Sequence, residues 1–256
     1  MKQRIITSFA IVAVVVPALF YGSIFKWILM AFICCGAGIE LLSLSKSKIS
    51  DIIKYGAIIL SFLLLLVSPL IGMAILSLLV LLYLSIPVII EDFKFNDSLL
   101  YISFTSIIFF LGNSFLFIYD YNRNLIWVIM FATYLCDIGA YFSGYFFGKN
   151  KLNTRISPKK TIEGSIGGYI CGVIAAILVA ILLNGNIDNV AVFIMCLVLP
   201  LTGQIGDLAF SAIKREGCIK DFSDLLPGHG GVLDRIDSLV FNLIVAYAII
   251  LIVGVI

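Results

Sequence analysis

GAIILSFLLLLVSPLIGMAILSLLVLLYLSIPVII, residues 56–90, decides the fold class, because it holds no charged side chain between Lys54 and Glu91. A helix needs about 20 apolar residues to cross the hydrocarbon core of a bilayer. The run is long enough for two such helices, and Ser68-Pro69 marks where they meet. Over the whole chain, 62% of residues are hydrophobic and 12% are charged, whereas soluble domains are about half apolar and about a quarter charged. We therefore expect lipid to surround most of this chain.

Working outward from this run, nine segments qualify as membrane spans. They lie at roughly 5–25, 27–45, 52–68, 70–90, 98–119, 125–147, 164–184, 189–210 and 233–255. Two substantial loops remain, 148–163 and 211–232. The sequence therefore predicts an all-α, polytopic membrane helix bundle that forms one integral membrane domain over 1–256. Its N-terminal helices occupy about 1–120, and its C-terminal part, about 125–256, carries the polar motifs.

The N-terminal charges favour a first helix that is kept in the membrane. Lys2 and Arg4 precede an apolar run to Phe20, which resembles a signal peptide, but the run is long and a second span follows almost at once. With the N-terminus in the cytoplasm, all but two of the 17 Lys and Arg residues, Lys26 and Arg123, fall in cytoplasmic segments. Such a bias sets membrane orientation, and it places both long loops on the cytoplasmic side.

Charge and cysteine content exclude other classes of site. A net charge of +2 is too small to indicate nucleic acid as a partner. Five of the six cysteines lie in apolar runs, where they read as small hydrophobic residues, and no Cys-x-x-Cys pair is present. A zinc site and a disulfide framework are therefore not expected.

A carboxylate stands inside the sixth predicted span. Asp137 occurs in ATYLCDIGAY, residues 132–141, and such a residue costs about 2.5–3.5 kcal/mol at the centre of a membrane helix on insertion scales. We interpret it as facing a polar cavity; the alternative is one buried partner that it contacts for packing. The nearby glycines, Gly139, Gly144 and Gly148, allow helices to pack closely.

The first long loop is basic. In GKNKLNTRISPKKTIEG, residues 148–164, Ser157-Pro158 predicts a turn that presents Lys159 and Lys160. Thr161 is suited to cap the following helix or to bond a phosphate oxygen. The residue types leave two interpretations open: a grip on a polyphosphate, or an anchor to anionic lipid headgroups.

The second polar stretch combines acids and bases. In GDLAFSAIKR, residues 206–215, Asp207, Ser211 and Lys214 fall on one helix face. Asp234 and Asp237, at i and i+3, face one way after the polar loop, although acids there also suit a solvated helix start. His229, between glycines, is a candidate for phosphate contact or proton transfer, or is a simple loop residue.

This pattern suits the joining of two phosphate esters. Mg²⁺ takes oxygen ligands, often one or two carboxylates plus substrate phosphates, and basic side chains stabilise charge on a departing group. The candidate metal ligands are Asp207, Asp234 and Asp237. The candidate phosphate contacts are Lys159, Lys160, Lys214, Arg215 and Lys220.

The stretch from Ser211-Ala-Ile-Lys-Arg215 through Pro227-Gly-His-Gly-Gly231 to Asp234-Arg-Ile-Asp237 resembles the signature of the CDP-diacylglycerol synthase family, also called phosphatidate cytidylyltransferase. Asp137-Ile-Gly-Ala-Tyr141 and Ser157-Pro-Lys-Lys-Thr-Ile-Glu-Gly164 are similar to two further motifs of that family. Glu40 falls where the family often carries a Glu-Trp pair. Two positions differ: Ile162 replaces the usual Trp, and Phe210 a residue that is often acidic.

The resemblance implies a helical membrane enzyme, usually a homodimer, that converts CTP and phosphatidic acid to CDP-diacylglycerol and pyrophosphate. It implies dependence on Mg²⁺, with room for a second cation, and a site that opens to the cytoplasmic face of a bacterial inner or plasma membrane, in contact with its lipids. The implied catalytic residues are Asp207, Lys214, Arg215, Lys220, Asp221, His229, Asp234 and Asp237. The implied substrate-binding residues are Asp137, Ser157, Lys159, Lys160, Thr161, Glu163 and Ser211.

Two other classes stay open from the residues alone. An acid inside a span is also typical of ion-coupled transporters, although these gather their key charges near the midplane of broken helices. Another membrane phosphotransferase is the second alternative.

Overall fold

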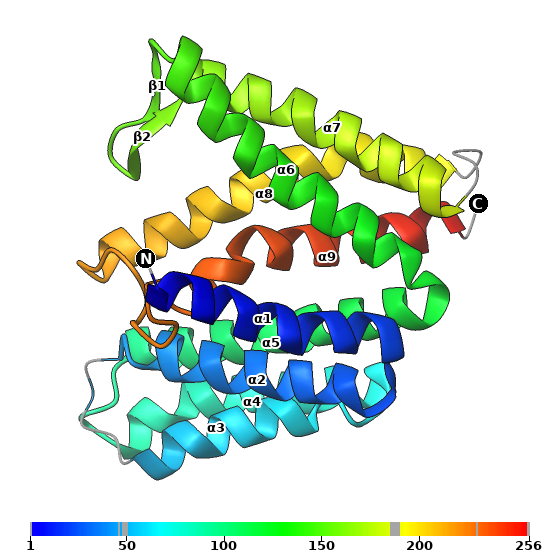
Figure 1. The fold of residues 1–256 in the computed structure, drawn as a ribbon. Helices are drawn as coiled ribbons and strands as arrows, with labels where there is room; N and C mark the ends of the chain where they lie inside the picture. The colour runs from blue at the N-terminus through cyan, green and yellow to red at the C-terminus, as the bar shows by residue number, and fades with distance from the viewer. Residues whose placement is uncertain (1, 46, 48–50, 185–189, 229, 255–256) are drawn as a thin grey trace. The chain divides into compact units, whose positions relative to one another are not determined.

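The computed structural model describes residues 2–45, 47, 51–184, 190–228 and 230–254, and within them the chain is almost entirely helical. Figure 1 shows the elements in order. The helices are α1 (Lys2–Tyr21), α2 (Ser23–Leu42), α3 (Asp51–Leu63), α4 (Pro69–Ile89), α5 (Phe95–Asn122), α6 (Asn124–Phe147), α7 (Ile162–Asn184), α8 (Val190–Glu216) and α9 (Leu233–Gly254). Two strands, β1 (Lys151–Asn153) and β2 (Ser157–Thr161), separate α6 from α7.

Seven of the described helices are long and apolar enough to span a membrane: α2, α4, α5, α6, α7, α8 and α9. A polytopic helical membrane protein is therefore confirmed. The number nine is not, because α3 has 13 residues, or roughly 20 Å, and the described apolar part of α1 is short. Leu64 to Ser68, which the sequence assigned to the third span, instead form turns before Pro69 begins α4.

An all-α prediction implies that the first long loop is irregular, but the structure contains a β-hairpin there. β1 and β2 form an antiparallel hairpin in which Lys151 pairs with Thr161 and Asn153 with Ser157. The turn lies at residues 154–156 rather than at Ser157-Pro158. Proline is tolerated there because a two-stranded sheet leaves half of its N–H groups without a partner strand.

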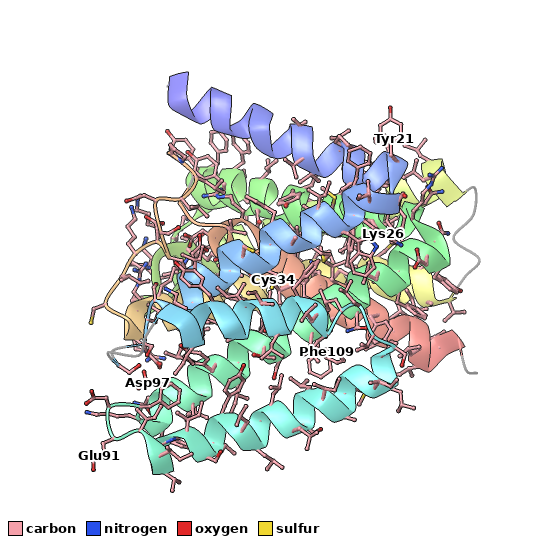
Figure 2. All side chains as sticks on the ribbon, turned by 90° about the horizontal axis from the view of Figure 1, so that it is seen from below. Tyr21, Lys26, Cys34, Glu91, Asp97 and Phe109 are labelled. Carbon is pink, nitrogen blue, oxygen red and sulfur yellow. The ribbon has the colours of Figure 1, made fainter. Side chains whose placement is uncertain are left out.

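The described chain divides into two compact units. The first comprises residues 1–113 and 221–235, so the polar loop before α9 packs with the N-terminal helices. Figure 2 shows Tyr21 and Lys26 at one end of this unit, Glu91 and Asp97 at the other, and Cys34 between them. Successive helix connections therefore alternate between the two ends, as expected for a chain that crosses a membrane repeatedly.

The second unit comprises residues 114–220 and 236–256 and contains the most intimate helix pair, α6 with α7. A Cβ atom on Gly168 would lie 2.7 Å from the Ala140 Cβ and the Cys136 carbonyl oxygen. A Cβ on Gly164 would lie 2.8 Å from the Ala140 carbonyl oxygen. The glycines of α7 thus face α6, and the two backbones approach closely because α7 carries no side chain at these contacts and α6 carries only the small Ala140 there.

A buried polar network ties α6, α8 and α9 together inside the second unit. Asn242 is fully buried; its Nδ2 donates to Thr133 Oγ1 at 2.7 Å, and its Oδ1 accepts from Thr202 Oγ1 at 2.6 Å. Each polar group has a partner, so the network adds specificity in surroundings where an unpaired group would be costly.

Candidate functional site

The polar centre of the second unit is Asp207 on α8. The Lys160 ammonium, on β2, forms an ion pair with its Oδ2. Ser211, one turn later, donates its hydroxyl hydrogen to Asp207 Oδ1 at 3.3 Å. The predicted helical stacking of Asp207, Ser211 and Lys214 is therefore correct, since α8 continues without interruption to Glu216.

Two further carboxylates lie close enough to interact electrostatically with Asp207. They are Asp137, on α6, and Asp237, on α9, and they also interact with each other. Lys160 acts on Asp137, and the buried Lys214 acts on Asp237. Three acids and two lysines from α6, β2, α8 and α9 thus lie within electrostatic reach of one another in one unit, and Lys160 and Asp207 are in direct contact. The side chain of Asp137 is exposed, and its position in a polar cavity stays a prediction.

The hairpin separates Lys159 and Lys160, which the sequence predicts to act together. Alternate residues of a strand point to opposite faces, so Lys160 reaches Asp207 whereas Lys159 is exposed. Thr161 caps α7, because its Oγ1 accepts from the Gly164 N–H at 3.1 Å. Ser157 begins β2 opposite Asn153 and is half-buried.

Two predicted site residues organise the backbone. The Glu163 carboxylate accepts from the N–H groups of Lys149 and Asn150 at 3.1–3.2 Å and thereby fixes the exit from α6. Arg215 donates from Nε to the Ile156 carbonyl oxygen at 3.2 Å and from Nη1 to the Ile219 carbonyl oxygen at 2.9 Å. Its guanidinium therefore joins the hairpin turn to the end of α8.

Asp234 belongs to the other compact unit, where it closes a loop. Its Oδ2 accepts from the N–H groups of Phe222 and Gly231, both at 2.9 Å. Lys220 and Asp221 are exposed at the start of this loop. His229 lies outside the described residues, so its predicted role stays a prediction.

The donor set is suited to a hard cation. Asp137, Asp207 and Asp237 offer carboxylate oxygens, the ligands that Mg²⁺ prefers. No group of three or more His, Cys, Asp or Glu side chains in the described part of the chain is close enough to hold a metal by itself. An ion held here would therefore have to complete its shell with water and substrate phosphates, as Mg²⁺ commonly does.

Sequence reasoning missed Gln204. It lies one turn before Asp207 and is buried; its Nε2 donates to the Ser165 carbonyl oxygen at 3.1 Å and to Cys136 Sγ at 3.2 Å, and Ser165 Oγ donates to its Oε1. Gln204 thus joins α6, α7 and α8 one turn before Asp207. The sequence feature that could have identified Gln204 is an amide side chain inside an apolar span, three residues from Asp207.

Phe210 explains one departure from the family pattern. Its ring is 2% exposed and meets Phe241 edge-on, with centroids 6.5 Å apart. The position is part of the α8–α9 packing in this chain, so a carboxylate would be buried there.

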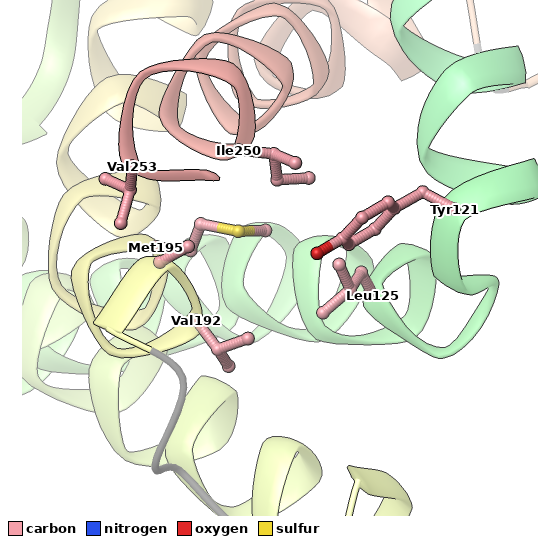
Figure 3. Close-up of a pocket in the computed structure, with 7 residues that line it drawn as sticks. Tyr121, Leu125, Val192, Met195, Ile250 and Val253 are labelled. Carbon is pink, nitrogen blue, oxygen red and sulfur yellow. The ribbon is translucent and has the colours of Figure 1, made fainter. Parts of the chain in front are cut away.

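A separate cavity of about 150 Å³ lies near the beginning of α8 (Figure 3). It is lined by Tyr121, Leu125, Ala191, Val192, Met195, Ile250 and Val253. Met195 and Asp207 are separated along α8 by roughly 18 Å, at 1.5 Å per residue. The cavity is therefore distinct from the polar centre.

Fold and site together define a class: an integral membrane protein in which helices and one hairpin bring acids and lysines near one another. The sequence model described as "Cytidylyltransferase family" matches residues 2–253, and the chain belongs to this family. It is 36% identical over 137 residues to the phosphatidate cytidylyltransferase of Staphylococcus saprophyticus, covering 52% of this chain and 53% of that protein. For the enzymes of the same name from Staphylococcus aureus strain COL and Staphylococcus haemolyticus, the identities are 37% and 35% over the same lengths.

The match thus spans about half the length of these curated relatives. Membership in the family, predicted from the resemblance, is confirmed over almost the whole chain.

Proposed function

We propose that the protein condenses CTP with phosphatidic acid to give CDP-diacylglycerol and pyrophosphate, a step of phospholipid biosynthesis. The observation that carries the proposal is the Lys160–Asp207 ion pair with Asp137, Asp237 and Lys214 in electrostatic reach, in a chain of the cytidylyltransferase family. The names of its relatives supply the particular substrates.

An oxygen of the phosphatidate phosphate attacks the α-phosphorus of CTP. The new P–O bond forms as the bond from the α-phosphorus to the bridging oxygen breaks, and pyrophosphate leaves with that oxygen. Lys160 and Lys214 stabilise phosphate charge, which is the main task in such a transfer. No covalent enzyme intermediate is required, because the phosphate oxygen is itself the nucleophile.

Asp137, Asp207 and Asp237 are the residues of this unit that would hold Mg²⁺, and we assign Asp234 to the same task from the sequence. The ion, when bound, screens charge between the two reactants and orients the leaving group. Ser211 orients Asp207, and Lys160 is placed to exchange its contact with Asp207 for a substrate phosphate. The apolar helices would admit the diacyl chains from the bilayer.

We further propose that the two long polar loops, 148–163 and 211–232, face the cytoplasm together with the N-terminus. With this orientation nearly all Lys and Arg residues belong to cytoplasmic segments. We also propose that the protein acts as a homodimer, which rests on the family resemblance alone.

Position-labelled CTP tests the reaction. Purified protein in phosphatidate-containing liposomes should transfer label from [α-³²P]CTP into chloroform-soluble lipid, and label from [γ-³²P]CTP into pyrophosphate, only with Mg²⁺ present. Chelation with EDTA should stop both, and added Mg²⁺ should restore them. A CTP hydrolase would leave the α-label in water-soluble CMP, and the absence of labelled lipid from folded protein would refute the proposal.

A further inference from the structure

Glu40 is a carboxylate buried in a membrane-spanning helix. It lies near the end of α2, is 1% exposed, and has Leu41 and Leu42 as buried neighbours. A carboxylate is costly in such surroundings unless its oxygens receive hydrogen bonds. Its partners therefore indicate why the residue is there.

The Glu40 carboxylate accepts hydrogen bonds from the loop before α9 and from the first residue of that helix. Oε1 accepts from the Ser223 hydroxyl at 2.6 Å and from the Val232 N–H at 2.7 Å, and Oε2 accepts from the Leu233 N–H at 2.8 Å. Leu233 is the first residue of α9. The first N–H groups of a helix lack partners within the helix, and a negative charge is favourable beside them. Glu40 therefore caps α9 from a helix far away in sequence.

The shape of α2 provides a second, independent observation. Gly36 lies one turn before Glu40, and a Cβ atom on it would lie 2.6 Å from Val232 Cγ2. A Cβ atom on Gly231 would lie 2.5 Å from Glu40 Oε1. α2 thus leaves space for the Val232 side chain beside the Glu40 carboxylate, which accepts a hydrogen bond from the Val232 N–H. Both features position the same loop.

Asp234 also stabilises the loop, because its carboxylate accepts hydrogen bonds from the N–H groups of Phe222 and Gly231. Asp234 closes the loop on itself, whereas Glu40 attaches the closed loop to α2. Residues 221–235 contain Asp221, Asp234 and most of the polar signature. Their position in this unit therefore depends on a residue outside the signature.

We propose that Glu40 is a positioning residue, which holds the signature loop 221–235 and the first turn of α9 against α2 and itself touches neither substrate. The inference deepens the proposed function and rests on it for its catalytic consequence. Its structural claim concerns the loop alone and can be measured separately.

Replacing Glu40 tests the proposal by hydrogen exchange and by kinetics. Glu40→Gln retains one oxygen but turns the other into a donor that cannot accept from an N–H group, and Glu40→Leu removes both. We expect faster amide exchange at residues 222–233, most in Glu40→Leu, with unchanged exchange in α6 and α7. Turnover should fall about 10- to 100-fold, the range for residues that support a functional group from behind, with Glu40→Gln intermediate between wild type and Glu40→Leu.

Asp97 provides a matched control in the same unit. It is also a buried acid, and it accepts from the Ser45 hydroxyl at 2.6 Å and the Lys94 N–H at 2.9 Å, at the start of α5. Asp97→Asn should leave exchange at 222–233 and turnover unchanged. Ser223→Ala, which removes one donor from the loop side, should show the Glu40 effect in weaker form even if the Glu40 variants fold poorly.

Each outcome decides a separate claim. Wild-type exchange at 222–233 in Glu40→Gln and Ser223→Ala would overturn the positioning role, and so would an equal loss in Asp97→Asn. If wild-type protein made no CDP-diacylglycerol, the proposed function would fail, while the exchange comparison would still decide whether Glu40 holds the loop.

Discussion

Carboxylates of one chemical type do two different things in this chain. Asp207 forms an ion pair with Lys160 and interacts electrostatically with Asp137 and Asp237, so its main partners are charged side chains. Asp234 and Glu40 instead accept hydrogen bonds from backbone N–H groups, so their carboxylates hold the backbone in place. The distinction rests on which partner the fold brings to each oxygen, and it predicts different responses to substitution.

Asp207→Asn should reduce CTP-dependent turnover at least roughly 100-fold, the order for removal of one preorganised charged group. The variant should fold, because the side chain is partly exposed and its size is retained. Labelled-lipid formation and size-exclusion elution measure the two effects. Ser211→Ala, which removes one hydrogen bond, should cost far less, and substantial activity in Asp207→Asn would contradict the assignment.

Asp234→Asn should also abolish turnover if Asp234 contributes to the metal site in addition to closing the loop. An amide oxygen can still accept from the Phe222 and Gly231 N–H groups, so the loop itself should survive. Turnover measured across a Mg²⁺ titration is informative here. Wild-type turnover at ordinary Mg²⁺ concentrations would show that Asp234 serves the loop alone.

Between elements, close backbone approach is the main feature of the second unit. Gly164 and Gly168 allow α7 to lie directly against α6, which carries Asp137, and the α7 residue Ser165 bonds Gln204 of α8 beneath Asp207. Because no strong hydrophobic force joins helices in lipid, such fitting contributes much of the association. The geometry of the acids therefore depends on small residues elsewhere.

Gly168→Leu should force α6 and α7 apart and lower stability by about 1–3 kcal/mol, the usual cost of overpacking. Gly56→Leu is the matched control, because a Cβ atom on Gly56 of α3 meets nothing within 4 Å. Thermal unfolding in detergent, followed by tryptophan fluorescence, should show a lower melting temperature for Gly168→Leu only. Equal melting temperatures would refute the packing argument.

At the scale of the whole molecule, the distribution of basic residues predicts orientation. Cys218 is exposed just after α8, in a segment predicted to face the cytoplasm, and Arg123 is the residue between α5 and α6, on the side predicted to face outward. In a protein whose other cysteines are replaced, Cys218 should react with a membrane-impermeant maleimide only after cells are permeabilised.

The converse variant completes the experiment. Arg123→Cys, in a chain without other cysteines, should react in intact cells. If Cys218 reacted in intact cells and the residue at position 123 did not, the inside-positive orientation would be reversed.

The sequence alone determined the membrane surroundings, the helical class and the family of the chain. Long uncharged runs require spans that satisfy their own backbone hydrogen bonds, and a helical period of 3.6 residues places Asp207, Ser211 and Lys214 on one face. These are local properties, so they can be read without the fold. The predicted number of spans is not confirmed, because the helix that forms at α3 is shorter than the apolar segment there.

Tertiary structure alone decided which residues meet. The side chains of Lys159 and Lys160 diverge because their segment is a strand, Arg215 is directed to backbone carbonyl groups, and Glu40 caps a helix almost two hundred residues away in sequence. Contacts of this kind depend on how distant helices pack, and neither composition nor periodicity encodes that packing.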